Sequence, residues 1–232
     1  MVCALAQSVG RDSGRRPAGD TVRSEFERRG GVVMARVRNQ DARRNQLVSA
    51  AIDVIANRGV GGMRVKDIAD AAEISPRLVA YYYPEIEDLV DEVYRNAVDR
   101  YYWQRLDAIS KLDDPRDRLV NLIDSGLPAG DDDMLNRALY ELAVNAGRDP
   151  SHGTLLTLLF DREVSLYVAV LEAGRASGAF VLTEPVLSIA QNFVALEDAY
   201  GMHLNGGNSS LDPSVAAGLM RSYARSVTGA DV

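Results

Sequence analysis

Apolar residues recur at helical spacing along most of the chain. Leu47, Ala51, Val54 and Ile55 stand at positions i, i+4, i+7 and i+8, which places them on one face of a helix. No long stretch alternates apolar and polar residues as a half-buried strand does. The pattern therefore predicts an all-α protein. Further helices are predicted at residues 65–72, 76–82, 85–110, 115–125, 134–147, 151–177, 185–204 and 212–228.

Several short helices are predicted close together between residues 47 and 89. Gly59, Gly61 and Gly62 end the first helix, because glycine readily adopts the left-handed conformation common at helix C-termini. Ser75 is a good N-cap for the third, and Pro76 at its first position loses no helical hydrogen bond. Two short helices joined by a tight turn form a helix-turn-helix, whose second helix enters the major groove of DNA.

Short motifs stand at characteristic spacing in this segment. They are residues 47–51 (LVSAA), Gly59, residues 65–69 (VKDIA), Ile74-Ser75, residues 81–83 (YYY) and residues 87–89 (EDL). Together they resemble the N-terminal domain of TetR-type transcriptional regulators. The resemblance implies a three-helix DNA-binding domain with a helix-turn-helix, followed by a larger helical domain for ligand binding and dimerisation. It also implies a cytoplasmic homodimeric repressor, released from a double-stranded DNA operator by a small molecule.

Three segments follow from this interpretation. Residues 1–35, rich in Arg, Gly and Ser, are predicted to be a disordered N-terminal extension. Residues 36–84 are predicted to be the helix-turn-helix domain, and residues 85–232 the ligand-binding and dimerisation domain. Met34 resembles the usual start of the family, so the extension either lies upstream of the native start or forms a basic arm that grips phosphates.

The candidate DNA contacts lie on the predicted face that points away from the core. By similarity to the family, Lys66, Arg77 and Tyr81 contact bases, and Tyr82 contacts a phosphate. An arginine such as Arg77 can pair with the edge of a guanine through two hydrogen bonds. Basic residues before the first core-facing stripe add sequence-blind phosphate contacts. The full set of predicted DNA-binding residues is Arg44, Arg64, Lys66, Ser75, Arg77, Leu78, Tyr81 and Tyr82.

Three positions depart from the family pattern. Glu73 replaces the usual glycine of the turn, and Ala80 replaces a tyrosine of the recognition helix. Ile86 replaces a lysine that meets a phosphate, and its neighbours Glu85 and Glu87 are acidic. An alternative function therefore stays open, namely a ligand-binding or interaction protein of the same fold with weak or lost DNA binding.

The charge distribution favours the DNA-binding interpretation. The net charge of the whole chain is −7. Residues 1–82 hold 14 basic and 9 acidic residues, whereas residues 83–232 hold 12 basic and 24 acidic ones. A basic head on an acidic body suits a DNA-binding domain joined to a domain with another role.

A ligand cavity is the expected feature of the body. Looser motifs, among them Leu142-Ala143, Arg148-Asp149-Pro150 and residues 196–201, resemble the subgroup of choline-sensing betaine-pathway repressors, but they identify no ligand. The cavity is predicted between the helices at 85–110, 115–125, 134–147 and 151–177. Its predicted wall residues are Trp103, Tyr140, Glu141, Asn145 and Tyr167. Aromatic rings with a carboxylate suit an organic cation, whereas the leucines alone suit a neutral apolar molecule, and both effector classes stay open.

Other functions find little support in the sequence. The only histidines, His152 and His203, lie far apart, and no His, Cys or Asp spacing fits a zinc site. No glycine-rich phosphate loop follows a strand. We therefore expect no catalytic residue, no metal and no cofactor, and predict that the protein is not an enzyme. The single cysteine, Cys3, fits a reducing cytoplasm, and no apolar run reaches the ~18 residues of a membrane span.

Overall fold

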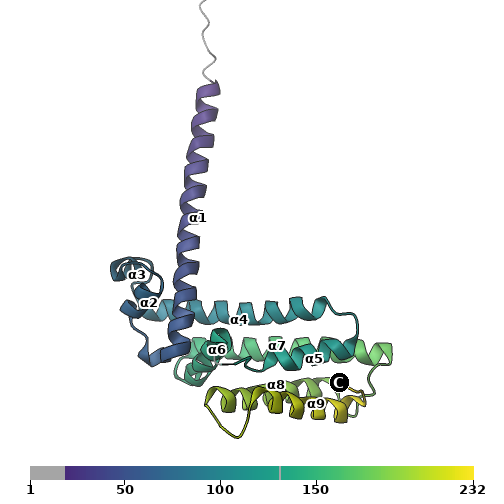
Figure 1. Cartoon of the computed structure of the whole chain (residues 1–232). Helices are drawn as coiled ribbons and strands as arrows, with labels where there is room; N and C mark the ends of the chain where they lie inside the picture. Colours follow the sequence, from purple (N-terminus) through teal and green to yellow (C-terminus); the bar gives the residue numbers. More distant parts are fainter. Residues whose placement is uncertain (1–18, 131) are drawn as a thin grey trace, which may run out of the picture. The chain divides into compact units, whose positions relative to one another are not determined.

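The computed structural model describes residues 19–130 and 132–232 (Figure 1). Within these ranges it contains nine α-helices, two short 3-10 turns and no strand, which confirms the predicted all-α class. The helices are α1 (Gly19–Arg58), α2 (Val65–Ala71), α3 (Pro76–Tyr82), α4 (Ile86–Ser110), α5 (Pro115–Gly126), α6 (Met134–Asn145), α7 (Pro150–Ser177), α8 (Val186–Asn205) and α9 (Pro213–Thr228). The 3-10 turns are η1 (Val60–Gly62) and η2 (Ala146–Arg148).

The chain divides into two compact units, of which the first ends at Arg44 and the second is Asn45–Val232. Residues 19–35 form the first part of α1, although the composition of this stretch favoured irregular chain. The rest of the predicted extension, including Cys3, lies outside the described residues. The helix-turn-helix and the body belong to the same second unit.

The turn between α2 and α3 explains how the helix-turn-helix tolerates Glu73. Glu73 has a φ of 54°, the left-handed conformation that favours glycine. The Ile74 N–H donates to the Ala69 carbonyl at 2.9 Å, and the Glu73 N–H donates to the Asp70 carbonyl at 3.2 Å. This is the Schellman pattern, which satisfies carbonyls that a helix end otherwise leaves without partners. The hydrogen bonds hold Glu73 in a conformation that its side chain disfavours.

The start of α3 follows from its first residues. The Ser75 hydroxyl accepts a hydrogen bond from the Leu78 N–H at 3.3 Å, and Pro76 occupies the first helical position, as predicted. Val79 turns inward and is fully buried with Ile68 of α2. Tyr83, just after α3, is buried as well, and its hydroxyl donates to Glu92 Oε2 at 2.8 Å.

Helix α7 is the central element of the body. It packs against α4, α5, α6 and α8, while α9 packs against α5 and α8 (Figure 1). The buried side chains form two apolar clusters. One joins the end of α1, the helix-turn-helix and the first part of α4 to α6 and the start of α7. The other joins α5, α8 and α9 to the later part of α7.

The boundary between the two clusters crosses α4 and α7 at charged residues. On α4 it falls between Tyr101 of the first cluster and Ile109 of the second, at Arg105. On α7 it falls between Leu159 and Val164, at Glu163. Both charged side chains are buried, so the two apolar clusters meet across a polar layer.

The strained turn gives a first prediction. Glu73→Gly is expected to raise the free energy of unfolding by about 1 kcal/mol, because the left-handed cost of about 1–2 kcal/mol exceeds the extra freedom of glycine in the unfolded chain. Glu73→Ala is the matched control, because it removes the side chain and keeps the β-carbon. Urea unfolding measures both variants, and equal stabilisation by alanine and glycine would contradict a backbone origin.

Candidate functional site

The exposed face of α2 and α3 carries most of the predicted DNA contacts. Lys66 and Arg77 are exposed, and Tyr81 is 67% exposed. Tyr82 is half-buried, and the edge of one tyrosine ring faces the other, with centroids 5.3 Å apart. The other predicted contacts are Arg64, exposed at the N-cap of α2, Ser75, exposed at the N-cap of α3, Leu78, half-buried in α3, and Arg44, exposed in the other compact unit. Contact of these residues with DNA stays a prediction.

Ile86, where the family has a lysine, has a packing role. It is the first residue of α4 and packs, half-buried, against the apolar cluster that contains the helix-turn-helix core. Its neighbours Glu85 and Glu87 are exposed. The side chain therefore adds apolar contact between α4 and the DNA-binding domain in place of a charge toward DNA.

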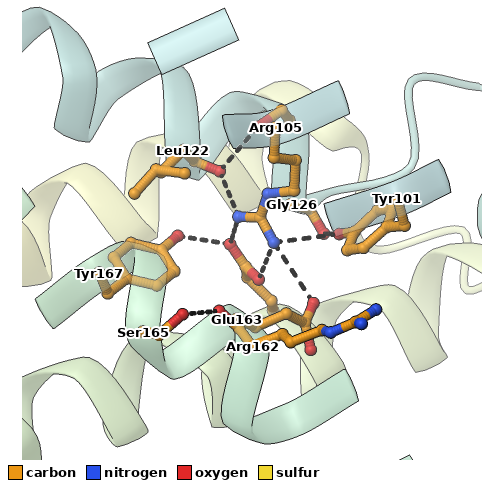
Figure 2. A network of polar contacts seen from close by, with 10 residues as sticks. Tyr101, Arg105, Leu122, Gly126, Arg162, Glu163, Ser165 and Tyr167 are labelled. Carbon is orange, nitrogen blue, oxygen red and sulfur yellow. Dashed lines mark hydrogen bonds and ion pairs between the residues drawn. The ribbon is translucent and has the colours of Figure 1, made fainter. Parts of the chain in front are cut away.

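A buried polar network lies where α4, α5, α7 and α8 meet (Figure 2). Arg105 of α4 is only 2% exposed. Its two terminal nitrogens pair with both oxygens of Glu197 of α8, Nη2 with Oε1 at 2.6 Å and Nη1 with Oε2 at 3.1 Å. Nη2 also donates to the Leu122 carbonyl of α5 at 2.8 Å, and Nη1 lies 3.3 Å from Glu163 Oε1 of α7. One guanidinium thus connects four helices.

Two tyrosines complete the network. Tyr101, one turn before Arg105 on α4, donates its hydroxyl proton to the Gly126 carbonyl at 3.3 Å. Tyr167 donates to Glu197 Oε1, and its ring stacks on Phe193 with centroids 4.7 Å apart. The two hydroxyl groups thus add hydrogen bonds to Gly126 of α5 and to Glu197 of α8.

The network contains two carboxylates and one guanidinium. Burial opposes the charge of Arg105, but Glu197 and its other neighbours outweigh burial and raise the pKa of Arg105 above its usual value. Burial and the Glu197 carboxylate raise the pKa of Glu163 well above its usual range, although Arg105 acts in the opposite direction. Burial is also the first cause of the raised pKa values of Tyr101 and Tyr167. The tyrosines therefore stay neutral donors, and the acid form of Glu163 is stabilised relative to that of an exposed carboxyl group.

A cavity of about 390 Å³ opens beside this network. Side chains from α4, α6, α7 and α8, with Gly126 at the end of α5, form its wall. They include the aromatic rings of Tyr101, Tyr140 and Phe160, and the carboxylates of Glu163, Glu197 and Asp198. The remaining lining residues are Asn136, Leu139, Ala143, Leu156, Thr157, Leu159, Gly201 and Asn205. The size is typical of pockets that hold small organic molecules, about 300–1,000 Å³.

The predicted wall residues lie in different places. Tyr140 lines the cavity, and Tyr167 lies behind Glu197, outside the lining. Trp103 is 58% exposed on α4 and does not line it. Glu141 faces the turn after α1, where a β-carbon at position 59 would lie 2.9 Å from Glu141 Oε2. Asn145 donates to the Glu141 carbonyl at 2.7 Å.

Arg105, Glu163 and Glu197 are not among the predicted site residues, and α8 is not among the helices predicted around the cavity. The sequence nevertheless contains a pattern that points to these three residues. Each of the three charges stands at a core-facing position of its helix, for example Glu197 one turn after buried Phe193. Charged residues are almost never fully buried unless they are paired. Three such positions with opposite signs predict a buried ion cluster between their helices.

The helix-turn-helix part of the chain matches a known protein family. Residues 47–93 match the family model "Bacterial regulatory proteins, tetR family". These residues are a tetR-family DNA-binding domain. The match runs from the core-facing part of α1 through the helix-turn-helix to the first part of α4.

Relatives extend the TetR similarity beyond this domain. The chain is 29% identical over 141 residues to the HTH-type transcriptional repressor KstR2 of Rhodococcus jostii (strain RHA1), covering 61% of this chain and 69% of that protein. It is 42% identical over 59 residues to the HTH-type transcriptional regulator LuxR of Vibrio harveyi, which is 25% of this chain and 29% of that protein. Both relatives are thus HTH-type transcriptional regulators.

A solved structure shows the same fold over most of the chain. A transcriptional regulator from Saccharomonospora viridis in complex with choline matches with a TM-score of 0.72 at 21% identity. The match covers 78% of this chain and 95% of that one. The fold shared with this structure therefore includes the body. Among the described residues, no helix has the length and apolar character needed to cross a membrane.

The network yields a second prediction. Arg105→Met keeps most of the apolar stem and leaves Glu197 buried without its partner, so the free energy of unfolding is expected to fall by about 3–5 kcal/mol. Arg95→Met is the matched control on the same helix, because Arg95 is exposed. Its Nη2 lies 3.8 Å from Asp91 Oδ2, and an ion pair at such a surface position contributes less than about 1 kcal/mol. Denaturant unfolding compares the two, and similar losses would show that the buried pair has no special weight.

Proposed function

We propose that the protein is a homodimeric transcriptional repressor that leaves its operator when a small molecule occupies the cavity beside Arg105. The observation that carries this proposal is the course of α4. Leu89 and Val93 of this helix pack in the core of the DNA-binding domain, whereas Tyr101 lines the cavity and Arg105 anchors the polar network. A change at the cavity therefore acts on the helix that supports the helix-turn-helix.

A second contact connects the same two regions. His152, near the start of α7, lies with Nε2 2.9 Å from Asp91 Oδ1 of α4. Helix α7 also carries Glu163 in the cavity wall. A ligand that prefers a shifted arrangement of α4 and α7 releases DNA in proportion to its preference for that arrangement. The solved neighbour with choline supports an effector that is a small organic molecule.

The exposed apolar residues of α8 and α9 support a homodimer. The apolar stripes of α7 and α8 pack within the protomer and are not free for an interface, as buried Leu166 and Phe193 show. Instead, Leu187 and Met202 of α8 and Leu219 of α9 are exposed. The outward face of α8 also carries the small residues Ala195 and Ala199, which permit close packing. Two such faces related by a two-fold axis bury each other.

The dimer can be tested by charge insertion. Leu219→Arg is expected to convert the protein from a dimer to a monomer at micromolar concentration, because the interface would bury an unpaired charge. Val144→Arg is the control, because Val144 is also an exposed apolar residue but lies on α6. Sedimentation velocity gives the oligomeric state, and a wild-type protein that is monomeric would refute the dimer.

The recognition helix can be tested by truncation. Arg77→Ala and Tyr81→Ala are each expected to weaken operator binding by about 1–3 kcal/mol, the usual loss for one good base contact. Both side chains are exposed, so the thermal midpoint should stay unchanged. Arg175→Ala, at an exposed position near the end of α7, is the control.

The measurement is a mobility shift on the upstream region of the protein's own gene. Wild-type affinity in both recognition-helix variants would show that α3 is not the reading helix. No binding by the wild-type protein would favour the alternative of a related fold with lost DNA binding.

A further inference from the structure

The described wall of the cavity contains acidic side chains and no basic one. Three carboxyl groups line it, and none of its described lining residues is Lys, Arg or His. The nearest guanidinium, that of Arg105, lies behind the wall and is held by Glu197 in a two-bond pair. The cavity therefore has one more carboxyl group than the network neutralises, even without Asp198 at its exposed rim.

The two glutamates of the wall differ in how their oxygens are used. Both oxygens of Glu197 accept hydrogen bonds from Arg105, and Oε1 accepts a further one from Tyr167. Glu163 has one contact, from Oε1 to Arg105 Nη1 at 3.3 Å, and no described residue donates to its Oε2 (Figure 2). Glu163 is nevertheless only 6% exposed and lines the cavity. It is a buried carboxyl group with an unused acceptor that faces the space a ligand would fill.

The rest of the wall suits a cation with an apolar surface. Tyr101, Tyr140 and Phe160 place three aromatic rings around the cavity. A cation over the face of such a ring is stabilised by about 0.5–2 kcal/mol, more when water is excluded. Leu139, Leu156 and Leu159 supply apolar contact for alkyl groups. An anionic ligand would meet Glu163 and Glu197 with no basic partner in the described lining.

We propose that the cavity takes a small organic cation, such as a quaternary ammonium ion, and that Glu163 is the carboxylate that pairs with it. Glu197 keeps its role as the partner of Arg105. The inference rests on the proposed function only in treating the cavity as the effector site.

Proton release follows from the same arrangement. The charged groups that act on Glu163 are Arg105 from α4 and Glu197 and Asp198 from α8. Tyr101 and Tyr140 share the cavity with it, and Tyr94 of α4 is near enough for Glu163 to contribute to its raised pKa. Burial and Glu197 raise the pKa of Glu163 in the empty cavity. A cation beside the carboxyl group lowers that pKa, so binding expels a proton. Affinity for a cation therefore rises with pH until the pH exceeds the pKa of the empty state.

The ligand class is tested with a matched pair of probes. One is 3-hydroxyphenyltrimethylammonium, and the other is 3-tert-butylphenol, its neutral carbon isostere. At pH 7, titration calorimetry of the full chain is expected to show at least about tenfold tighter binding of the cation. Glu163→Gln should abolish most of this preference, whereas Glu172→Gln, an exposed position on the same helix, should keep it. A thermal melt confirms that each variant is folded.

Three outcomes would overturn the assignment. They are equal or tighter binding of the neutral isostere, an unchanged cation preference in Glu163→Gln, and no binding of this cation or of the tetraalkylammonium series up to tetrabutylammonium at millimolar concentration. The mobility shift is a separate readout. A cation that binds through Glu163 but leaves the operator complex intact would refute the proposed release and leave the ligand class standing.

Proton release is tested with tetraethylammonium, which has no titratable group. Burial and Glu197 raise the pKa of Asp198 to about 6, so this group titrates as well. Wild type and Glu163→Gln are therefore measured over the same pH range, and the difference between them is the contribution of Glu163. The dissociation constant is expected to fall by up to about tenfold per pH unit. Calorimetry in buffers with different ionisation enthalpies should show proton release that Glu163→Gln removes. A constant affinity with no proton release would overturn this coupling.

Discussion

A guanidinium buried among apolar helices must find partners for its charge, and in this protein that requirement fixes the body. Arg105 is 2% exposed, so nearly all of the hydration that it has in the unfolded chain is lost. Glu197 and the Leu122 carbonyl replace that water from two different helices. Their positions cannot drift far, because a broken buried pair costs about 3–5 kcal/mol. The relative placement of α4, α5 and α8 is therefore specified more narrowly by this polar layer than by apolar contact, which many arrangements satisfy.

The position of the layer matters for signalling. It separates the apolar cluster that includes the DNA-binding domain from the cluster around α8 and α9. A ligand in the adjoining cavity touches residues on both sides, Leu139 and Leu159 of the first cluster together with Glu197 and Gly201 of α8. Moving an equilibrium from 1:99 to 99:1 needs about 5.5 kcal/mol of differential binding. The loss of one partner from a buried ion pair costs about 3–5 kcal/mol, which is a large part of that difference.

Local sequence rules predicted the helices well because the signals are local. The range 76–82 matches α3 at both ends, since Ser75, Pro76 and Pro84 mark those ends by themselves. The end of α7 is equally local, because Gly178 adopts the left-handed conformation that stops the helix. Residues 19–35 belong to the stretch predicted to be disordered, and they form the first part of α1. Composition alone does not decide between helix and coil.

The cavity wall was harder to predict because it depends on which faces of distant helices meet. Tyr140 lies in the lining of the cavity, whereas Trp103 and Glu141 lie outside it. The residue types on a helix do not show how that helix is rotated about its axis, and this rotation decides which side chains face the cavity. Arg105, Glu163 and Glu197 become visible only when their charges are read as members of apolar stripes.

Two departures from the TetR pattern, Ile86 and Glu73, affect how the helix-turn-helix is held in place. The resemblance to the family implies that Ile86 removes one phosphate contact, so we expect the slope of log affinity against log salt to be shallower by about 0.9 for each head. In exchange, its side chain packs against the cluster that joins α4 to the helix-turn-helix. The strained Glu73 is held by the backbone hydrogen bonds of its own turn. The orientation of the head therefore depends on packing with α4 rather than on an ionic contact made through DNA. A head held in this way follows α4 when the helix moves, whether or not DNA is bound.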